Sequence, residues 1–240
     1  MPVRGKKPLA KPRKRRPLRT LVLIVILLPL ISVGVLRFVP PLVTILMVKQ
    51  AVAGHGMDYR WRSLDNISPY LVRAAIAAED ARFCEHKGFD FDAIQKALKA
   101  NERAEQSGSA KVRGGSTISQ QTAKNVFLWP GRDWVRKGLE AGFTGLIELG
   151  WGKRRIIEVY LNVAEWAPGV YGAEAASQHW FGKSAKDLTR QQASRLAAIL
   201  PAPRRYKAAT PGPYVQRRAS RIRANMNEVQ VQGLDSCVLG

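Results

Sequence analysis

The feature that most constrains this chain is a run of seventeen uncharged residues between Arg19 and Arg37. At about 1.5 Å per residue, a helix of this length nearly spans a hydrocarbon core of about 30 Å, and Arg37 can snorkel to extend it. A cleaved signal peptide is the alternative, but its apolar region is shorter and ends at a small-residue cleavage site. Here apolar residues continue through Phe38–Val48 without such a site. The run therefore predicts an uncleaved transmembrane helix over residues 20–39.

Positive charge is concentrated before this helix. Residues 1–19 contain nine Lys or Arg and no Asp or Glu, and the whole chain has a net charge of +21. Because basic flanks stay in the cytoplasm, we expect a basic cytoplasmic tail over 1–19 and a main domain beyond the membrane. The basic excess also predicts anionic partners.

The rest of the chain divides into three parts. Residues 40–60, which begin with two prolines, are expected to form a membrane-proximal connecting segment, followed by a compact domain over 61–226. Residues 227–240 show no clear periodicity and are expected to fray as a C-terminal tail. Residues 42–48 form a short apolar patch, which either packs in the core or lies in the bilayer beside the anchor.

The domain is predicted to be mostly helical, with strands that are short and peripheral because no segment alternates cleanly over six residues. Thr189 and Gln192 form a capping box before the last predicted helix. Residues 105–115 are small, polar and glycine-rich, which predicts a mobile loop. Helices are expected over residues 68–83, 91–104, 116–125, 134–150, 153–164, 171–180 and 189–200.

The two cysteines, Cys84 and Cys237, lie far apart in the sequence. They make neither a disulfide scaffold nor a zinc-binding pattern. We expect Cys84 to pack as a small apolar residue.

Glu79 is a carboxylate on an apolar helix face. Ser68 is a suitable N-cap and Pro69 fits the first helical position. One face of the helix then carries Val72, Ile76, Glu79 and Phe83. A buried carboxylate is costly unless it is paired, and its raised pKa makes it a useful proton acceptor. This helix alone leaves a structural ion pair and a catalytic base both open.

A second candidate site follows the glycine-rich loop. Two glycines at 114–115 open a helix, which would leave backbone N–H groups free to meet an anion. Thr117, Gln121 and Lys124 then form a polar stripe on one helix face.

More charged residues follow this stripe. Arg132 lies near a Trp-Pro-Gly turn, and Lys137 and Glu140 are neighbours on the next predicted helix. By itself the Lys137–Glu140 pair is most simply a solvated ion pair.

Four stretches occur in order along the chain: EDARFCEHKG, GGSTISQQTAKN, RKGLEA and KRRIIEVYLN. Together they resemble the successive motifs of the peptidoglycan glycosyltransferases, lysozyme-like enzymes that polymerise lipid II. The resemblance covers roughly residues 62–206, and Ser119 replaces a commoner threonine while keeping the hydroxyl. The chain leaves no room for the transpeptidase domain of bifunctional members and contains no S-x-x-K or K-T-G motif. The resemblance therefore implies the monofunctional, single-pass form.

The resemblance implies a role for each matching residue. Glu79 matches the general base that deprotonates the 4-hydroxyl of the acceptor sugar, and Glu140 matches a second essential carboxylate on the donor side. The implied substrate-binding residues are Asp80, Phe83, His86, Ser116, Thr117, Gln121, Lys124, Arg132 and Lys137. Lys153, Tyr160 and Asn162 match positions of structural importance.

The implied reaction polymerises lipid II into β-1,4-linked glycan and releases undecaprenyl pyrophosphate. It requires no cofactor, although the pyrophosphate makes Mg²⁺ or Mn²⁺ chemically sensible, and no cluster of metal ligands is evident. The implied partners are lipid II, the growing glycan chain, the bilayer and proteins of cell-wall synthesis or division, with no nucleic acid. The implied location is the inner membrane, with the catalytic domain in the periplasm.

Two other functions compete with this one. A membrane-anchored lysozyme-like lytic enzyme would cleave peptidoglycan and would need no phosphate cradle, so Lys124, Arg132 and Lys137 argue against it. A basic module that binds nucleic acid or anionic lipid fits the net charge, but no nucleic-acid motif is present.

Overall fold

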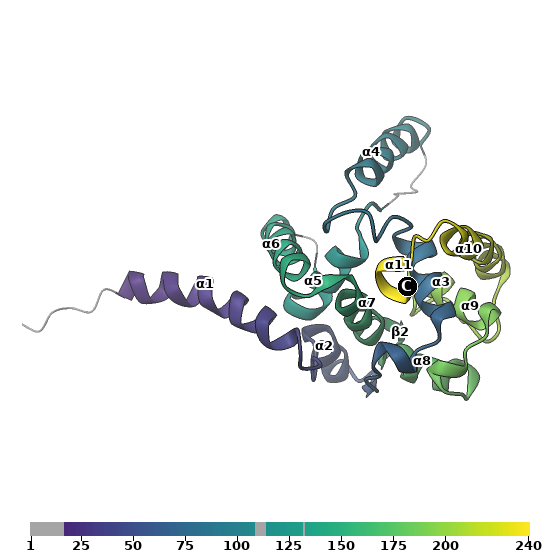
Figure 1. Cartoon of the computed structure of the whole chain (residues 1–240), viewed down its shortest axis with the longest axis horizontal. Coiled ribbons are helices and arrows are strands. Elements are labelled where there is room, and N and C mark those ends of the chain that lie inside the picture. The colour runs from purple at the N-terminus through teal and green to yellow at the C-terminus, as the bar shows by residue number, and fades with distance from the viewer. Residues whose placement is uncertain (1–16, 109–113, 132) are drawn as a thin grey trace, which may run out of the picture.

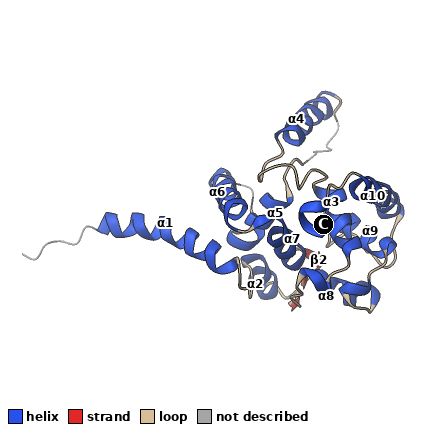
Figure 2. Cartoon of the chain, viewed as in Figure 1, coloured by secondary structure: helices blue, strands red, loops and turns tan. Residues whose placement is uncertain are grey.

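The computed structural model describes residues 17–108, 114–131 and 133–240. Arg132, residues 109–113 of the predicted mobile loop and residues 1–16 of the basic tail lie outside the described residues. The described chain is mostly helical, as predicted (Figure 2). Figure 1 shows a body of packed helices from which α1 (Pro17–Leu36) projects.

Helix α1 is joined to the body near its C-terminal end. The indole N–H of Trp151 donates to the carbonyl of Val33 at 2.7 Å, and the Arg155 guanidinium donates to the carbonyl of Leu36 at 2.9 Å. Among the residues that the structure describes, no helix is long and apolar enough to cross a membrane. The transmembrane helix expected over residues 20–39 therefore stays a prediction.

The structure divides the apolar patch between the core and the surface. Helix α2 (Ile45–Val52) carries Met47, which is fully buried. Leu42 and Val48 expose 84% and 49% of their surfaces, respectively. The core alternative is therefore met in part, and the bilayer alternative stays a prediction for the exposed half.

Helix α3 (Pro69–Glu79) packs against both α9 (Arg190–Ile199) and α10 (Pro213–Val231), which also pack against each other. Its apolar face is buried, as predicted. Ser68 precedes the helix, but its hydroxyl donates to the carbonyl of Leu188 at 2.9 Å instead of capping the helix. The start of α3 is thus tied to the chain before α9.

The remaining helices surround this layer. Helix α5 packs against α6 and α7, while α4 stands apart from the body at the top of Figure 1. The bounds are α4 (Phe91–Gln106), α5 (Ile118–Phe127), α6 (Trp134–Gly150), α7 (Gly152–Val163), α8 (Ala173–Phe181) and two 3-10 turns, Leu64–Asn66 and Ala185–Asp187.

Three short strands form one small sheet in the order β1-β3-β2. They are β1 (Asp58–Tyr59), β2 (Glu165–Ala167) and β3 (Val170–Tyr171), with β1 parallel and β2 antiparallel to β3. The strands are as short as predicted. They are not peripheral, because Trp166 and Tyr171 are fully buried.

The C-terminal region is where the sequence-based expectation was wrong. Helix α10 was not predicted, and it continues through the supposed tail to Val231 before α11 (Ser236–Leu239) ends the chain. An apolar stripe holds α10 against the body: Val215, Ala219, Ile222, Met226 and Val229. The apolar residues of this stripe recur every three or four positions, and their burial keeps the tail from fraying.

Cys84 does not pack as a free apolar side chain. It forms a disulfide with Cys237, 153 residues away in the sequence. Nearby, Arg73 on α3 pairs with Asp235 at 2.6 Å. The expectation was wrong because distance along the chain does not limit contact in space once α11 folds back onto the body.

Candidate active site

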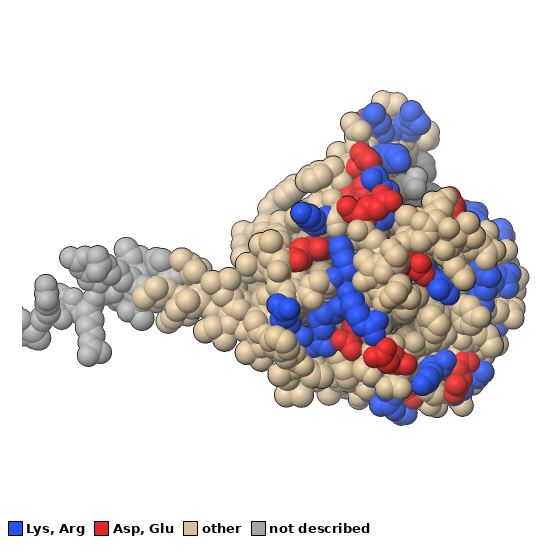
Figure 3. Space-filling view, in the orientation of Figure 1, with Lys and Arg blue, Asp and Glu red and all other residues tan. Residues whose placement is uncertain are grey.

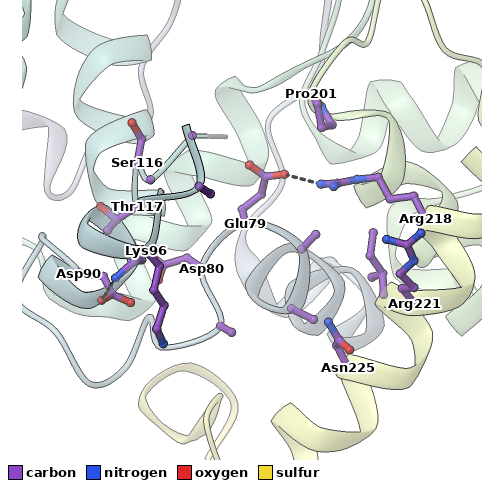
Figure 4. A pocket seen from close by; sticks show the side chains of 18 of the residues that line it. Glu79, Asp80, Asp90, Lys96, Ser116, Thr117, Pro201, Arg218, Arg221 and Asn225 are labelled. Atoms are coloured by element: carbon purple, nitrogen blue, oxygen red, sulfur yellow. Dashed lines mark hydrogen bonds and ion pairs between the residues drawn. The ribbon is translucent and has the colours of Figure 1, made fainter. Parts of the chain in front are cut away.

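A cleft of about 1340 Å³ opens at the C-terminal end of α3. One of its walls is built by α4 and residues 114–117, and the opposite wall by α10 (Figure 4). Pockets for small ligands typically measure about 300–1,000 Å³. The cleft is therefore large enough for an extended substrate.

Glu79, the last residue of α3, lies between the two walls (Figure 4). Its Oε2 accepts a hydrogen bond from Nε2 of Gln121 at 3.0 Å, and its Oε1 pairs with Nη2 of Arg218 at 3.2 Å. Burial raises the pKa of Glu79, while the Gln121 hydrogen bond and the Arg218 charge oppose that rise. With 16% of its side chain exposed, Glu79 can still meet a ligand in the cleft as a proton acceptor.

Gln121 is itself held in place by Tyr160 on α7. The Tyr160 hydroxyl donates to Oε1 of Gln121 at 3.5 Å, which leaves the amide NH₂ turned toward Glu79. Burial raises the pKa of Tyr160 well above its ordinary value, so the phenol keeps the proton that it donates. Tyr160, which was expected to be structural, thus orients Gln121 beside Glu79.

Asp80 and His86 bond to each other beside Glu79. Nε2 of His86 lies 2.9 Å from Oδ1 of Asp80, and Oδ2 of Asp80 accepts the backbone N–H of Ile118 at 2.9 Å. Asp80 lines the cleft but is nearly fully buried. These contacts tie the loop after α3 to the start of α5. They therefore fix the position of Glu79 relative to Gln121.

Thr117 is the N-cap of α5 and not the first member of a helical polar stripe. Its hydroxyl donates to the carbonyl of Gly88 at 2.6 Å and accepts from the N–H of Gln120 at 3.2 Å. The N–H of Ile118 is bound by Asp80. The prediction of free N–H groups is therefore wrong for these two donors, because protein side chains already cap them.

Ser116 is exposed and lines the cleft together with the two preceding glycines. A Cβ atom at Gly115 would lie 3.2 Å from the Ile94 Cα, a tight contact, so glycine favours the close approach of this segment to α4. Phe83, by contrast, is fully buried, with Nζ of Lys153 4.5 Å from its ring centre. Phe83 therefore has no surface for a ligand and supports the loop from the core.

Glu140 on α6 is almost completely buried between two cations. Its Oε2 accepts from Nη1 of Arg136 at 2.7 Å, and its Oε1 accepts from Nζ of Lys137. The predicted Lys137–Glu140 pair is confirmed, although the carboxylate is buried and not solvated. Arg136 is a partner that the sequence analysis missed.

Lys124, one helical turn beyond Gln121, is influenced by both carboxylates. Burial lowers the pKa of Lys124, and the charge of Glu140 opposes that effect. Arg136 and Lys137 lower the pKa further, and Glu79 raises it slightly. Lys124 is thus a partly desolvated ammonium group near two other cations, and a bound anion would offset this positive charge.

Helix α10 supplies cleft residues that the sequence analysis did not identify. Tyr214, Arg217, Arg218, Arg221 and Asn225 all line the cleft. The signal was present in the segment YVQRRASRIRANM, where apolar residues recur at helical spacing between the arginines. Recognising α10 as a helix would have placed these side chains on one face.

The described residues contain no group of three or more His, Cys, Asp or Glu that could hold a metal ion. What they do place around one cleft is a carboxylate with a raised pKa and several cations. A base beside positive charge suits deprotonation of an attacking hydroxyl and departure of an anionic leaving group.

The comparison with known proteins covers most of the chain. The family model described as Transglycosylase matches residues 47–227. A biosynthetic peptidoglycan transglycosylase of Caulobacter vibrioides is 57% identical over 228 residues, which are 93% of this chain and 97% of the relative. Proteins of the same description from Rhodospirillum centenum and Pseudomonas aeruginosa are 52% and 54% identical, over 85% and 82% of this chain and 86% and 85% of the relatives.

Proposed function

The chain belongs to the transglycosylase family and is a peptidoglycan glycosyltransferase that acts on lipid II and glycan chains, and from this premise we propose a role for each side of its cleft. Glu79 is the general base. It removes the proton from the 4-hydroxyl of the acceptor sugar, and the resulting oxygen attacks C1 of the donor sugar with inversion. The bond from C1 to the pyrophosphate oxygen breaks, and the electron pair leaves with undecaprenyl pyrophosphate.

The observation that carries this proposal is the setting of Glu79. Gln121 and Arg218 fix both carboxylate oxygens beside the cleft, and burial raises the pKa of the group. A base with a raised pKa is a better proton acceptor at neutral pH than an ordinary surface carboxylate. The buried ion pair and the catalytic base, left open by the sequence, thus coexist at one residue.

Lys124, with Lys137 and the Glu140–Arg136 pair, forms the donor side. These cations stabilise the negative charge that develops on the pyrophosphate. Ser116 contacts the donor sugar. A divalent cation, Mg²⁺ or Mn²⁺, would enter with the pyrophosphate, since the described residues form no metal site of their own.

Incubation of the purified protein with lipid II, with and without a chelator, tests this function. We expect polymer, and a lower rate in the presence of chelator if the pyrophosphate carries a cation. Breakdown of preformed glycan without synthesis would instead identify a lytic enzyme. Absence of both activities would leave a binding module and would refute the proposal.

We further propose that α1 anchors the protein in the inner membrane and that the exposed half of the apolar patch lies in the bilayer beside it. Exposed apolar side chains run along α1 from Leu23 to Ile31, and Leu42, Ile45 and Val48 are exposed nearby. A substrate with a polyprenyl tail stays in the bilayer, because each buried CH₂ contributes about 0.8 kcal/mol. The Cys84–Cys237 disulfide supports an oxidising compartment beyond the membrane for the catalytic domain.

A variant that begins at Ser32 keeps the contacts of Val33 and Leu36 with the body and tests the patch. It should still float with liposomes, although more weakly than the full chain. Replacement of Leu42, Ile45 and Val48 by serine should then release it from liposomes without lowering its melting temperature. If the triple variant is unfolded, the patch belongs to the core and the proposed membrane contact is wrong.

A further inference from the structure

One face of α10 forms a cationic wall of the cleft. Tyr214, Arg217, Arg218, Arg221 and Asn225 all line the cleft, and their spacing of three or four residues places them along one side of the helix. Figure 4 shows Arg218 and Arg221 extending from α10 toward the cleft, with Arg218 reaching Glu79. The carboxylates that line the cleft all come from α3, α4 and the segment between them.

The arginines of this wall differ in their partners. Arg218 pairs with Glu79 at 3.2 Å. Arg217 and Arg221 are exposed, and neither has a carboxylate partner among the residues that the structure describes. Two guanidinium groups four residues apart lie on neighbouring turns of the helix, so they can act on one anionic segment together.

The opposite wall carries both signs of charge, since Asp90, Asp92, Lys96 and Arg103 all line the cleft there. Asp92 on α4 pairs with Arg82 at 2.6 Å, and Asp90 lies 3.9 Å from the same guanidinium. Figure 3 shows basic and acidic side chains mixed on α4, whereas basic side chains gather along the α10 edge of the molecule. The cations of the opposite wall therefore lie among carboxylates, whereas no carboxylate of α10 lines the cleft.

Lipid II offers two kinds of anion to such a wall, its pyrophosphate and the carboxylates of its stem peptide. The pyrophosphate stays near the bilayer because of the lipid attached to it. In Figure 1, α10 lies at the end of the molecule opposite to α1, the proposed anchor. The peptide, carried on the sugar, can reach farther from the membrane than the pyrophosphate can.

We propose that Arg217 and Arg221 bind carboxylates of the stem peptide of the substrate. This inference rests on the proposed function, since it names a further part of the same substrate. Tyr214 lies beside the two arginines and stacks on Tyr206, with ring centres 4.9 Å apart. The aromatic pair gives the peptide an apolar surface next to the two charges. Because the arginines are positively charged, they favour an acidic peptide over a neutral one.

A pair of substrates tests the inference. The Arg217→Ala/Arg221→Ala variant and the wild type are assayed on lipid II with its full stem peptide and on an analogue whose stem is a single alanine amide. On full lipid II, the variant should lose about three- to tenfold in kcat/KM, the scale of two partly exposed ion pairs. On the analogue, the variant and the wild type should differ by less than about twofold.

Arg223→Ala is the matched control, because Arg223 lies on the same helix but does not line the cleft. It removes the same charge and should change neither value. An equal loss by the double variant on both substrates would assign the arginines to the pyrophosphate or the glycan and overturn the inference. No loss on either substrate would overturn it as well. In both cases wild-type polymerisation would leave the proposed function standing.

Discussion

Glu79 and Glu140 are two carboxylates that both influence Lys124 but lie in different surroundings. Glu140 lies almost fully buried on α6, and a cation binds each of its oxygens. Glu79 ends α3 at the edge of the cleft, with one oxygen on the neutral amide of Gln121 and the other on Arg218. Both are buried enough to be costly, but only Glu140 is fully compensated.

The difference indicates how the two carboxylates can serve different roles. A carboxylate that binds a cation with each oxygen fixes the positions of those cations. A carboxylate whose burial is only partly offset has a raised pKa and can accept a proton from a substrate. Lys124 is linked to both carboxylates, because the charges of Glu140 and Glu79 both raise its pKa.

The largest expected effect is on stability at Glu140. Glu140→Ala leaves the buried Arg136 guanidinium without its carboxylate, which should lower the free energy of unfolding by about 3–5 kcal/mol. Glu140→Gln keeps the volume and one acceptor and should lose less. Urea unfolding measures both variants. A Glu140→Ala protein as stable as the wild type would show that the cations do not depend on this residue.

Glu79→Gln should lower activity and not stability. Loss of the base should reduce kcat by at least about 10²-fold, the scale of general-base catalysis. Stability should be kept or increased. Because the folded-state pKa of Glu79 is raised, its stabilising contribution is fully present below the unfolded-state pKa and is lost as pH rises through the folded-state pKa. Glutamine cannot ionise, so it avoids that loss at neutral pH. Near-normal polymerisation by a folded Glu79→Gln protein would reduce Glu79 to a structural residue.

Lys124→Ala should have the smallest effect of the three. The loss of one charged contact to the leaving pyrophosphate should cost about 10- to 100-fold in kcat/KM. Lys124→Arg should restore only part of the rate, because a planar guanidinium is not a point charge. Normal activity of Lys124→Ala on lipid II would remove this lysine from the donor side.

Sequence patterns predicted most helices of the body but not α10, and of the candidate site residues Glu79, Asp80, Ser116, Thr117 and Gln121 line the cleft. The apolar face of α3 and the Lys137–Glu140 spacing each follow from helical periodicity, a local property. The N–H of Ile118 did not follow, because Asp80, 38 residues earlier, occupies it only after the chain has folded. The N–H of Gln120 could have been predicted as capped, because Thr117 and Gln120 have the spacing of a capping box.

The main omission was long-range. Arg218 lies 139 residues after Glu79, and Cys237 lies 153 residues after Cys84. Nothing local in either segment indicates its partner. The alternation of arginine and apolar residues in α10 could have predicted a helix, but the cleft wall that it forms depends on how α10 packs against α3 and α9.

The pH dependence of kcat/KM for lipid II tests the central claim most directly, since the claim is that Glu79 is a base with a raised pKa. On the acidic side, activity should fall with an apparent pKa above the value of about 4.3 for an ordinary glutamate. The residual activity of Glu79→Gln should lack this acidic limb. A wild-type profile that stays flat down to the ordinary glutamate range, or a limb that persists in Glu79→Gln, would contradict the account.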